Sequence, residues 1–159
     1  MNVTRQGFGL VFRQPRRALL IFRMANWLVL FTVLLKFLSL SRALQIISTP
    51  VRKNSVQPNE EELATAVDTL LRADVFMFRP SCWKRAAILH RYLALAGIDS
   101  RINFGMRKDN DGGMSGHAWL ERSGQAFLET SPPEYTVTYS FPSEWRAQHL
   151  RSDVERFMS

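Results

Sequence analysis

The sequence predicts an α+β domain in which helices come first and an antiparallel sheet follows. Three observations predict it. The length of 159 residues is that of one ordinary domain. A hydrophobic content of 46 %, with 11 Phe, 4 Trp and 3 Tyr, is enough for a packed core and excludes a disordered chain. Apolar residues recur at helical spacing up to about residue 97 and at every second position beyond it.

The net charge of +7 is concentrated at the start of the chain. Residues 1–59 hold 9 of the 21 Lys and Arg residues and no Asp or Glu. We therefore divide the chain into a cationic, apolar helical segment over residues 1–58, which is part of the core or packs on it, and a core over residues 59–159. The cationic segment is not a Lys/Arg tract with interleaved aromatic residues of the kind that wraps a strand of nucleic acid, so we expect no nucleic-acid partner.

The apolar N-terminal stretch predicts a helical pair, at about residues 15–38 and 40–48. Arg23 and Lys36 limit its longest uncharged run to residues 24–35, which is shorter than the roughly 20 residues of a membrane-spanning helix. No clear cleavage site follows it, so we expect a retained helix of the core. The alternative is a helix that also touches the membrane surface or a partner protein, with anionic groups facing Arg13, Arg16, Arg17 and Arg23.

Two more helices are predicted after a proline-containing loop over residues 49–57. Asn59 is a good N-cap, and three glutamates follow it in a first turn that favours anions, so this helix runs to about Asp74. A short loop over residues 75–80 precedes Ser81, which predicts the cap of a helix that runs to about residue 96 and closes at Gly97.

Period-two alternation predicts the sheet. The expected strands cover residues 102–106, 117–121, 125–130 and 135–140, with a polar loop over 107–116 and a tight turn at Ser123-Gly124. An amphipathic helix is predicted over residues 143–157.

Cys82 is the single cysteine and stands in the first turn of its predicted helix. One cysteine excludes an internal disulfide and a paired-cysteine zinc site, fits a reducing compartment, and leads us to expect no metal. Ala86, Leu89 and Leu93 follow at helical spacing, which places the thiol on the buried stripe that faces the sheet. A helix N-terminus favours a thiolate and can hold an oxyanion, so Cys82 is a candidate nucleophile. The alternative is an unreactive core cysteine.

His117 is the candidate base, because His90 and His149 lie in helices. If residues 122–124 form a three-residue hairpin loop, His117 stands opposite Glu129 on one face of the sheet. The carboxylate would then hold one imidazole nitrogen and leave the other for the thiol, as in a Cys-His-acid triad. A two-residue loop would place Glu129 on the opposite face. The alternatives are an ordinary strand histidine and a solvated carboxylate.

Two tryptophans, Trp83 and Trp119, are candidate substrate-binding residues that wall the cleft. The alternative is that both belong to the core.

The segments RPSCWKRAAILHRYLALAGIDSRINFGMR and SGHAWLERSGQAFLET resemble a known family. In order and spacing they are similar to the transglutaminase-like peptidases of lasso-peptide biosynthesis, called leader peptidases or B proteins. The family pattern is a Ser-Cys helix start, a Gly-Ile turn into a strand, a His-Ala-Trp motif and an acidic residue shortly after a glycine hairpin. The resemblance covers about residues 60–132, and more loosely residues 18–47. This chain has Glu129 where the family usually has Asp.

The resemblance implies a transglutaminase-like (papain-like) core and a cysteine protease that removes the leader from a ribosomally made precursor peptide, without a cofactor. The implied partners are the precursor, a lasso cyclase and a separate leader-binding protein, since the chain is too short for a fused recognition domain. The positive charge of the first 59 residues suggests that they bind the leader-binding protein or the leader itself. We expect a cytoplasmic location. The membrane surface is a further candidate partner, which residues 1–48 would contact peripherally.

Two other functions fit the same residues. The triad would also serve an acyl transferase with an amine acceptor, since only the acceptor differs. A cationic membrane-associated or scaffold protein without enzymatic activity would carry its cysteine and histidine by accident.

Overall fold

The computed structural model describes residues 15–51, 59–72, 81–110, 112–129 and 134–142. The predicted helix over residues 143–157 and most of the predicted loops over 49–57 and 75–80 lie outside these residues. The elements confirm the α+β prediction, because helices precede an antiparallel sheet. In chain order they are α2 (Pro15–Phe37), α3 (Leu40–Ile47), α4 (Glu60–Leu71), α5 (Cys82–Leu95), β1 (Arg101–Lys108), β2 (Met114–Arg122), β3 (Gln125–Phe127) and β4 (Thr136–Phe141).

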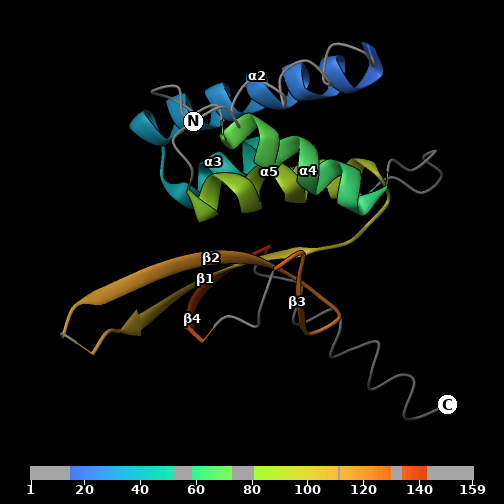
Figure 1. Cartoon of the computed structure of the whole chain (residues 1–159). Helices are drawn as coiled ribbons and strands as arrows, with labels where there is room; N and C mark the ends of the chain where they lie inside the picture. Colours follow the sequence, from blue (N-terminus) through green and yellow to red (C-terminus); the bar gives the residue numbers. More distant parts are fainter. Residues whose placement is uncertain (1–14, 52–58, 73–80, 111, 130–133, 143–159) are drawn as a thin grey trace, which may run out of the picture.

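The described helices stack on one face of the sheet (Figure 1). Helix α5 packs on β2 and β1, α3 and α4 contact α5, and α2 lies across them as the outermost layer. One apolar core joins the four described helices to the sheet, so those of the cationic segment share their core with the described rest of the chain. Its largest fully buried side chains include Met24, Leu28, Phe31, Leu44, Leu63, Ile88, Leu89, Leu93, Ile102 and Leu120.

The helix ends confirm two capping predictions and correct a third. The side chain of Asn59 accepts a hydrogen bond from the backbone N–H of Glu61 at 3.2 Å, and Gly97 follows α5 with a φ of +83°. Ser81 occupies the N-cap position of α5 in an extended conformation, but its side chain makes no capping hydrogen bond. Within the described residues, its hydroxyl oxygen is buried without a hydrogen-bond partner.

The sheet has the strand order β3-β2-β1-β4, and all its pairs are antiparallel. The turn between β1 and β2 is shorter than predicted, because β1 continues to Lys108 and β2 begins at Met114. The backbone N–H of Asp109 closes this turn by donating to the carbonyl of Gly113 at 2.8 Å. His117 therefore lies inside β2, where it pairs with Gly105, and not at the start of a strand after a loop.

The β2–β3 hairpin has a two-residue loop, and the predicted three-residue loop is wrong. Arg122 pairs with Gln125, and Ser123 and Gly124 form the loop with φ values of 51° and 80°. A two-residue loop with both residues at positive φ matches the right-handed twist of the flanking strands.

Candidate active site

Cys82 is the first residue of α5, and its thiol is partly exposed. The residues that follow it on the same helix face, Ala86, Leu89 and Leu93, are at most 2 % exposed, as the spacing predicted. This stripe packs α5 on the sheet and fixes the position of the helix start. The first-turn backbone N–H groups of a helix have no partners within the helix, and they favour negative charge next to them.

A cleft of about 420 Å³ brings Cys82 and His117 together in one lining. Its other walls come from α2, α3, α5, β1, β2 and β4 and are mostly apolar. They comprise Leu35, Leu40, Trp83, Phe104, Gly105, Met106, Gly116, Ala118 and Thr138. A second hollow of about 430 Å³ also borders Cys82, with the charged residues Asp68, Arg72 and Arg85 in its lining. Cys82 thus lines both hollows.

His117 and Glu129 face each other across the site. The imidazole Nε2 lies 3.5 Å from a carboxylate oxygen of Glu129, and the exposed fractions of the two side chains are 27 % and 18 %. This separation exceeds the 2.7–3.2 Å of an ordinary N–H···O hydrogen bond. Catalytic contacts are often long in the absence of substrate and shorten when substrate binds. With Nε2 directed at the carboxylate, Nδ1 is the ring nitrogen available to a thiol.

Glu129 reaches this position by a route that the sequence analysis did not foresee. Phe127 pairs with Leu120, so a continued β3 would have placed Glu129 on the face away from His117. Strand β3 ends at Phe127, however, and Leu128 adopts a left-handed conformation with a φ of 57°. This turn replaces the strand and brings the carboxylate back toward the imidazole. The predicted neighbour was right and the predicted register was wrong.

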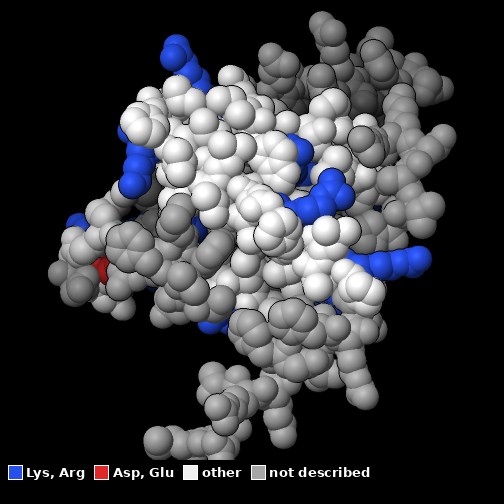
Figure 2. All heavy atoms as spheres, turned by 90° about the horizontal axis from the view of Figure 1, so that it is seen from above, with Lys and Arg blue, Asp and Glu red and all other residues white. Residues whose placement is uncertain are grey.

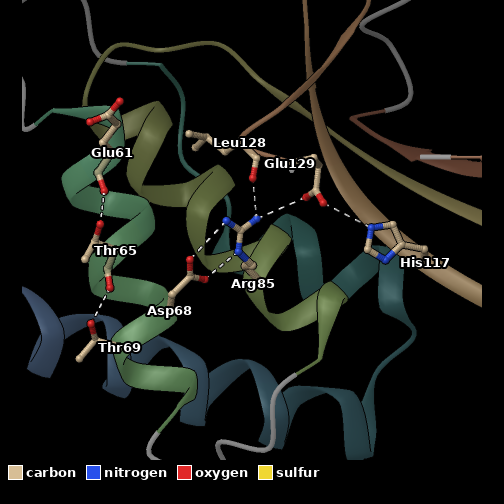
Figure 3. A network of polar contacts seen from close by, with 8 residues as sticks. All are labelled: Glu61, Thr65, Asp68, Thr69, Arg85, His117, Leu128 and Glu129. Carbon is tan, nitrogen blue, oxygen red and sulfur yellow. Dashed lines mark hydrogen bonds and ion pairs between the residues drawn. The ribbon is translucent and has the colours of Figure 1, made fainter. Parts of the chain in front are cut away.

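Arg85 holds Glu129 from the side opposite His117 (Figure 3). One of its terminal nitrogens, Nη1, lies 3.3 Å from the Glu129 oxygen that does not face the imidazole, and it donates to the carbonyl of Leu128 at 3.1 Å. Its Nε donates to Asp68 of α4 at 2.8 Å. The guanidinium therefore joins α4, α5 and the segment after β3 at one point, and it also holds the left-handed turn.

Sequence reasoning missed Arg85 and Asp68. Arg85 carries a signal, because it follows Cys82 by three residues and so lies almost one turn further along the same helix face. Asp68 gives no such signal, since only the packing of α4 on α5 brings it within reach.

Aromatic rings hold the imidazole of His117. The ring of Trp119 stacks on it at 5.9 Å between centroids, and the ring of Tyr135, which the sequence analysis also missed, lies at 5.3 Å. Trp83 lines the cleft as predicted, and it also contacts Phe31 of the core edge-on. Trp119 is 5 % exposed and is not among the residues that line this cleft, so its predicted contact with substrate stays a prediction. Its indole ring stacks on the imidazole and so supports one face of that ring.

The arrangement combines a thiol at a helix N-terminus, an imidazole in the same cleft and a carboxylate that faces the imidazole. These are the parts that covalent acyl transfer requires. In the described residues, no cluster of three or more His, Cys, Asp or Glu side chains suits a metal ion.

A comparison with protein families matches residues 26–140 to a model described as the transglutaminase-like superfamily. The match runs from within α2 to within β4 and includes Cys82, His117 and Glu129. Comparisons with curated proteins and with solved structures gave no match.

Proposed function

Because the chain belongs to the transglutaminase-like superfamily, which includes cysteine proteases and acyltransferases, we propose that it is a cysteine peptidase that removes the leader from a lasso-peptide precursor. One observation carries the proposal. Cys82, the first residue of α5, and His117 line the same cleft. The carboxylate of Glu129 faces His117, and Arg85 binds that carboxylate.

In the first half of the reaction the Cys82 sulfur attacks the carbonyl carbon at the leader–core junction, and His117 takes the thiol proton. The oxygen of the tetrahedral intermediate becomes negative, and backbone N–H groups at the start of α5 would receive it. When the intermediate collapses, the C–N bond breaks and His117 returns the proton to the leaving amine. The leader is then held as a thioester, and the core peptide has a free N-terminus.

In the second half a water molecule attacks the thioester, and His117 takes a proton from the water. The C–S bond breaks, the leader leaves with a free carboxyl group, which ionises in water, and His117 returns its proton to sulfur. The sum is one peptide bond hydrolysed and one water consumed. General-base assistance of this kind contributes about 10²–10⁴-fold.

Glu129 holds the imidazole in the tautomer and orientation that both halves need, and Arg85 is a positioning residue that acts through Glu129. Arg85 reaches the Glu129 oxygen that does not face His117, and its second partner, Asp68, anchors the guanidinium to a neighbouring helix. Removal of Arg85 would leave two carboxylates without their shared cation and the Leu128 carbonyl without its donor.

Leader removal is the narrower part of the proposal. It is supported by the resemblance over residues 60–132, by the apolar cleft beside the thiol and by a cationic segment suited to an acidic leader or to a leader-binding protein. The free N-terminus made in the reaction is what a lasso cyclase would join to an acidic side chain.

The decisive experiment mixes the protein with the precursor peptide encoded beside its gene, with and without the neighbouring leader-binding protein, and follows the products by mass spectrometry. Hydrolysis gives two fragments whose masses add up to the precursor plus one water. The variant Cys82→Ala should keep its fold and lose cleavage, and residual cleavage above about one part in a thousand would remove Cys82 from the nucleophile's role.

Two other outcomes separate the rival functions. A product that carries an added amine in place of water identifies an acyl transferase with the same residues. If no product forms and the alkylation rate of Cys82 does not change in His117→Ala, thiol and imidazole do not act together, and the non-enzymatic alternative gains support.

A further inference from the structure

The outward face of α2 carries large apolar side chains that the rest of the described structure does not cover. Each of these side chains is between 39 and 80 % exposed, because α2 is the outermost layer of the described fold. They fall on one side of a helix with 3.6 residues per turn, opposite the side that packs into the core. Exposed apolar surface of this extent marks an interaction site. We call these residues the apolar stripe: Leu19, Phe22, Leu30, Val33 and Phe37.

Cationic side chains border the apolar stripe on both sides. Arg16 and Arg23 follow one margin and Lys36 the other, and all three are exposed. Residues 15–51 contain no Asp or Glu. Figure 2, which views the molecule from the α2 side, shows a mostly uncharged surface with Lys and Arg projecting from it and very little acidic surface. Long cationic side chains at such margins bury their stems beside apolar residues and extend their charges to anionic headgroups.

From this arrangement we infer that the apolar stripe docks on the surface of an anionic lipid membrane, with α2 lying in the membrane plane. By length and composition, α2 is the one described helix that could cross a membrane. Its inner side, however, belongs to the core, where Met24, Leu28 and Phe31 are at most 1 % exposed. A helix held in this way inserts only its outer side, along a length of about 35 Å for 23 residues.

The charges favour a lipid surface over a second copy of this chain. Two copies that met through their apolar stripes would bring Arg16, Arg23 and Lys36 of each copy close together, with no acidic residue in the 15–51 segment to compensate them. In an anionic bilayer, the acyl chains would contact the apolar stripe, and the negative headgroups would contact the cationic side chains at its margins.

The docked helix ends beside the candidate active site. Leu35 of α2 and Leu40 of α3 line the cleft that holds Cys82, and Phe37 between them is 80 % exposed. Leu35 lies one turn after Phe31, on the inner side of α2, so a chain seated on a membrane would hold its cleft about one helix diameter from the lipid surface. The inference goes beyond the proposed function and uses none of its catalytic residues.

The test is flotation of the full chain with phosphatidylcholine vesicles, prepared with and without phosphatidylglycerol. The wild-type chain should float with the anionic vesicles and be released as the salt concentration rises. The double variant Phe22→Ser/Phe37→Ser should bind at least about tenfold more weakly, because two apolar side chains no longer enter the lipid. Arg16→Gln/Lys36→Gln should lose the preference for anionic lipid. Met114→Ser, which changes a residue of β2 that is 61 % exposed, is the matched control and should bind like wild type.

Two outcomes overturn the inference. One is the absence of flotation for a folded wild-type chain. The other is flotation that Phe22→Ser/Phe37→Ser leaves unchanged, with circular dichroism showing that the variant is folded. Self-association, or binding of a soluble protein, that the double variant abolishes in the absence of vesicle binding counts against lipid as the occupant. Cys82→Ala should float like wild type, so failure of the peptidase proposal and failure of this one are distinguishable.

Discussion

The guanidinium of Arg85 and the carboxylate of Glu129 lie 3.3 Å apart, and the other oxygen of that carboxylate faces His117. Arg85 thus sets the position of a group that in turn sets the position of the imidazole. We predict that Arg85→Met lowers kcat about tenfold, equivalent to about 1.4 kcal/mol, with little change in KM. Arg85→Lys should recover part of the loss, since a single ammonium keeps the charge without the planar fork.

The matched control for Arg85 is Arg122→Met. Arg122 pairs with Glu60 at 2.8 Å, but both side chains are largely exposed, and Arg122 lies five residues beyond His117 along β2. Exposed ion pairs contribute about 0–1 kcal/mol to stability, so this variant should keep its kcat. Equal losses of kcat in both arginine variants would show a general effect of charge and not of position.

The second prediction concerns the order of importance within the candidate triad. His117→Ala should lower cleavage more than Glu129→Ala, because the base moves the proton whereas the carboxylate only holds the ring. Single-turnover rates of precursor cleavage measure both effects. A Glu129→Ala variant as active as wild type would exclude Glu129 from the site.

The third prediction tests the aromatic support of His117. A Cβ at Gly105 would lie 2.8 Å from Cβ of Tyr135 and 2.9 Å from the ring of Trp119. Gly105→Ala should therefore displace these rings and destabilise the fold by about 1–3 kcal/mol, the usual cost of overpacking. Thermal denaturation and the near-ultraviolet circular dichroism of tryptophan report both effects.

Gly116→Ala is the control for Gly105→Ala. Gly116 lies in the neighbouring strand, and an added Cβ there would meet its nearest atom at 3.9 Å, an ordinary contact. Its Tm should stay close to that of wild type. If the two alanine variants melt alike, the crowding at Gly105 does not constrain the sheet.

The fourth prediction concerns acid stability. Burial lowers the pKa of His90 from 6.5 to about 4, even though the charge of Asp99 and the hydrogen bond with Ser100 act in the other direction. Between these two pH values the unfolded chain binds a proton that the folded chain does not. Stability that is fully present above pH 6.5 is therefore lost as the pH falls toward 4, by about 3 kcal/mol in total.

Urea denaturation of wild type and of His90→Gln at pH 7 and pH 4.5 measures this effect. The uncharged glutamine has no proton to take up, so the loss of stability between the two pH values should be smaller in the variant by about 2 kcal/mol. Identical losses in the two proteins would assign the acid sensitivity to other groups.

Much of the fold follows from local patterns in the sequence. Asn59 and Gly97 mark helix ends through chemistry that their immediate neighbours supply, and both were predicted correctly. The hydrophobic spacing after Cys82 located the buried face of α5 for the same reason. These features depend on residues within about one or two turns, so a single sequence contains them.

The features that were predicted wrongly or not at all depend on backbone conformation or on contacts between residues distant in sequence. The β2–β3 loop length depends on a positive φ at Ser123, and the place of Glu129 depends on a positive φ at Leu128, which few leucines adopt. Arg85 reaches Leu128 and Asp68 across three elements. The proximity of His117 and Glu129 was anticipated from a wrong register, and their catalytic roles stay predictions.

The wall that Leu35 and Leu40 give to the cleft has a practical consequence for dissecting the chain. An isolated fragment that starts at residue 59 would keep the sulfur, the imidazole and the carboxylate but would lack one wall of the cleft that Cys82 and His117 line. It would also expose the apolar surfaces of α4 and α5 that α2 now covers, and such surfaces aggregate. Production of a shortened enzyme should therefore retain the two N-terminal helices, or supply them as a separate peptide that reassembles with the rest.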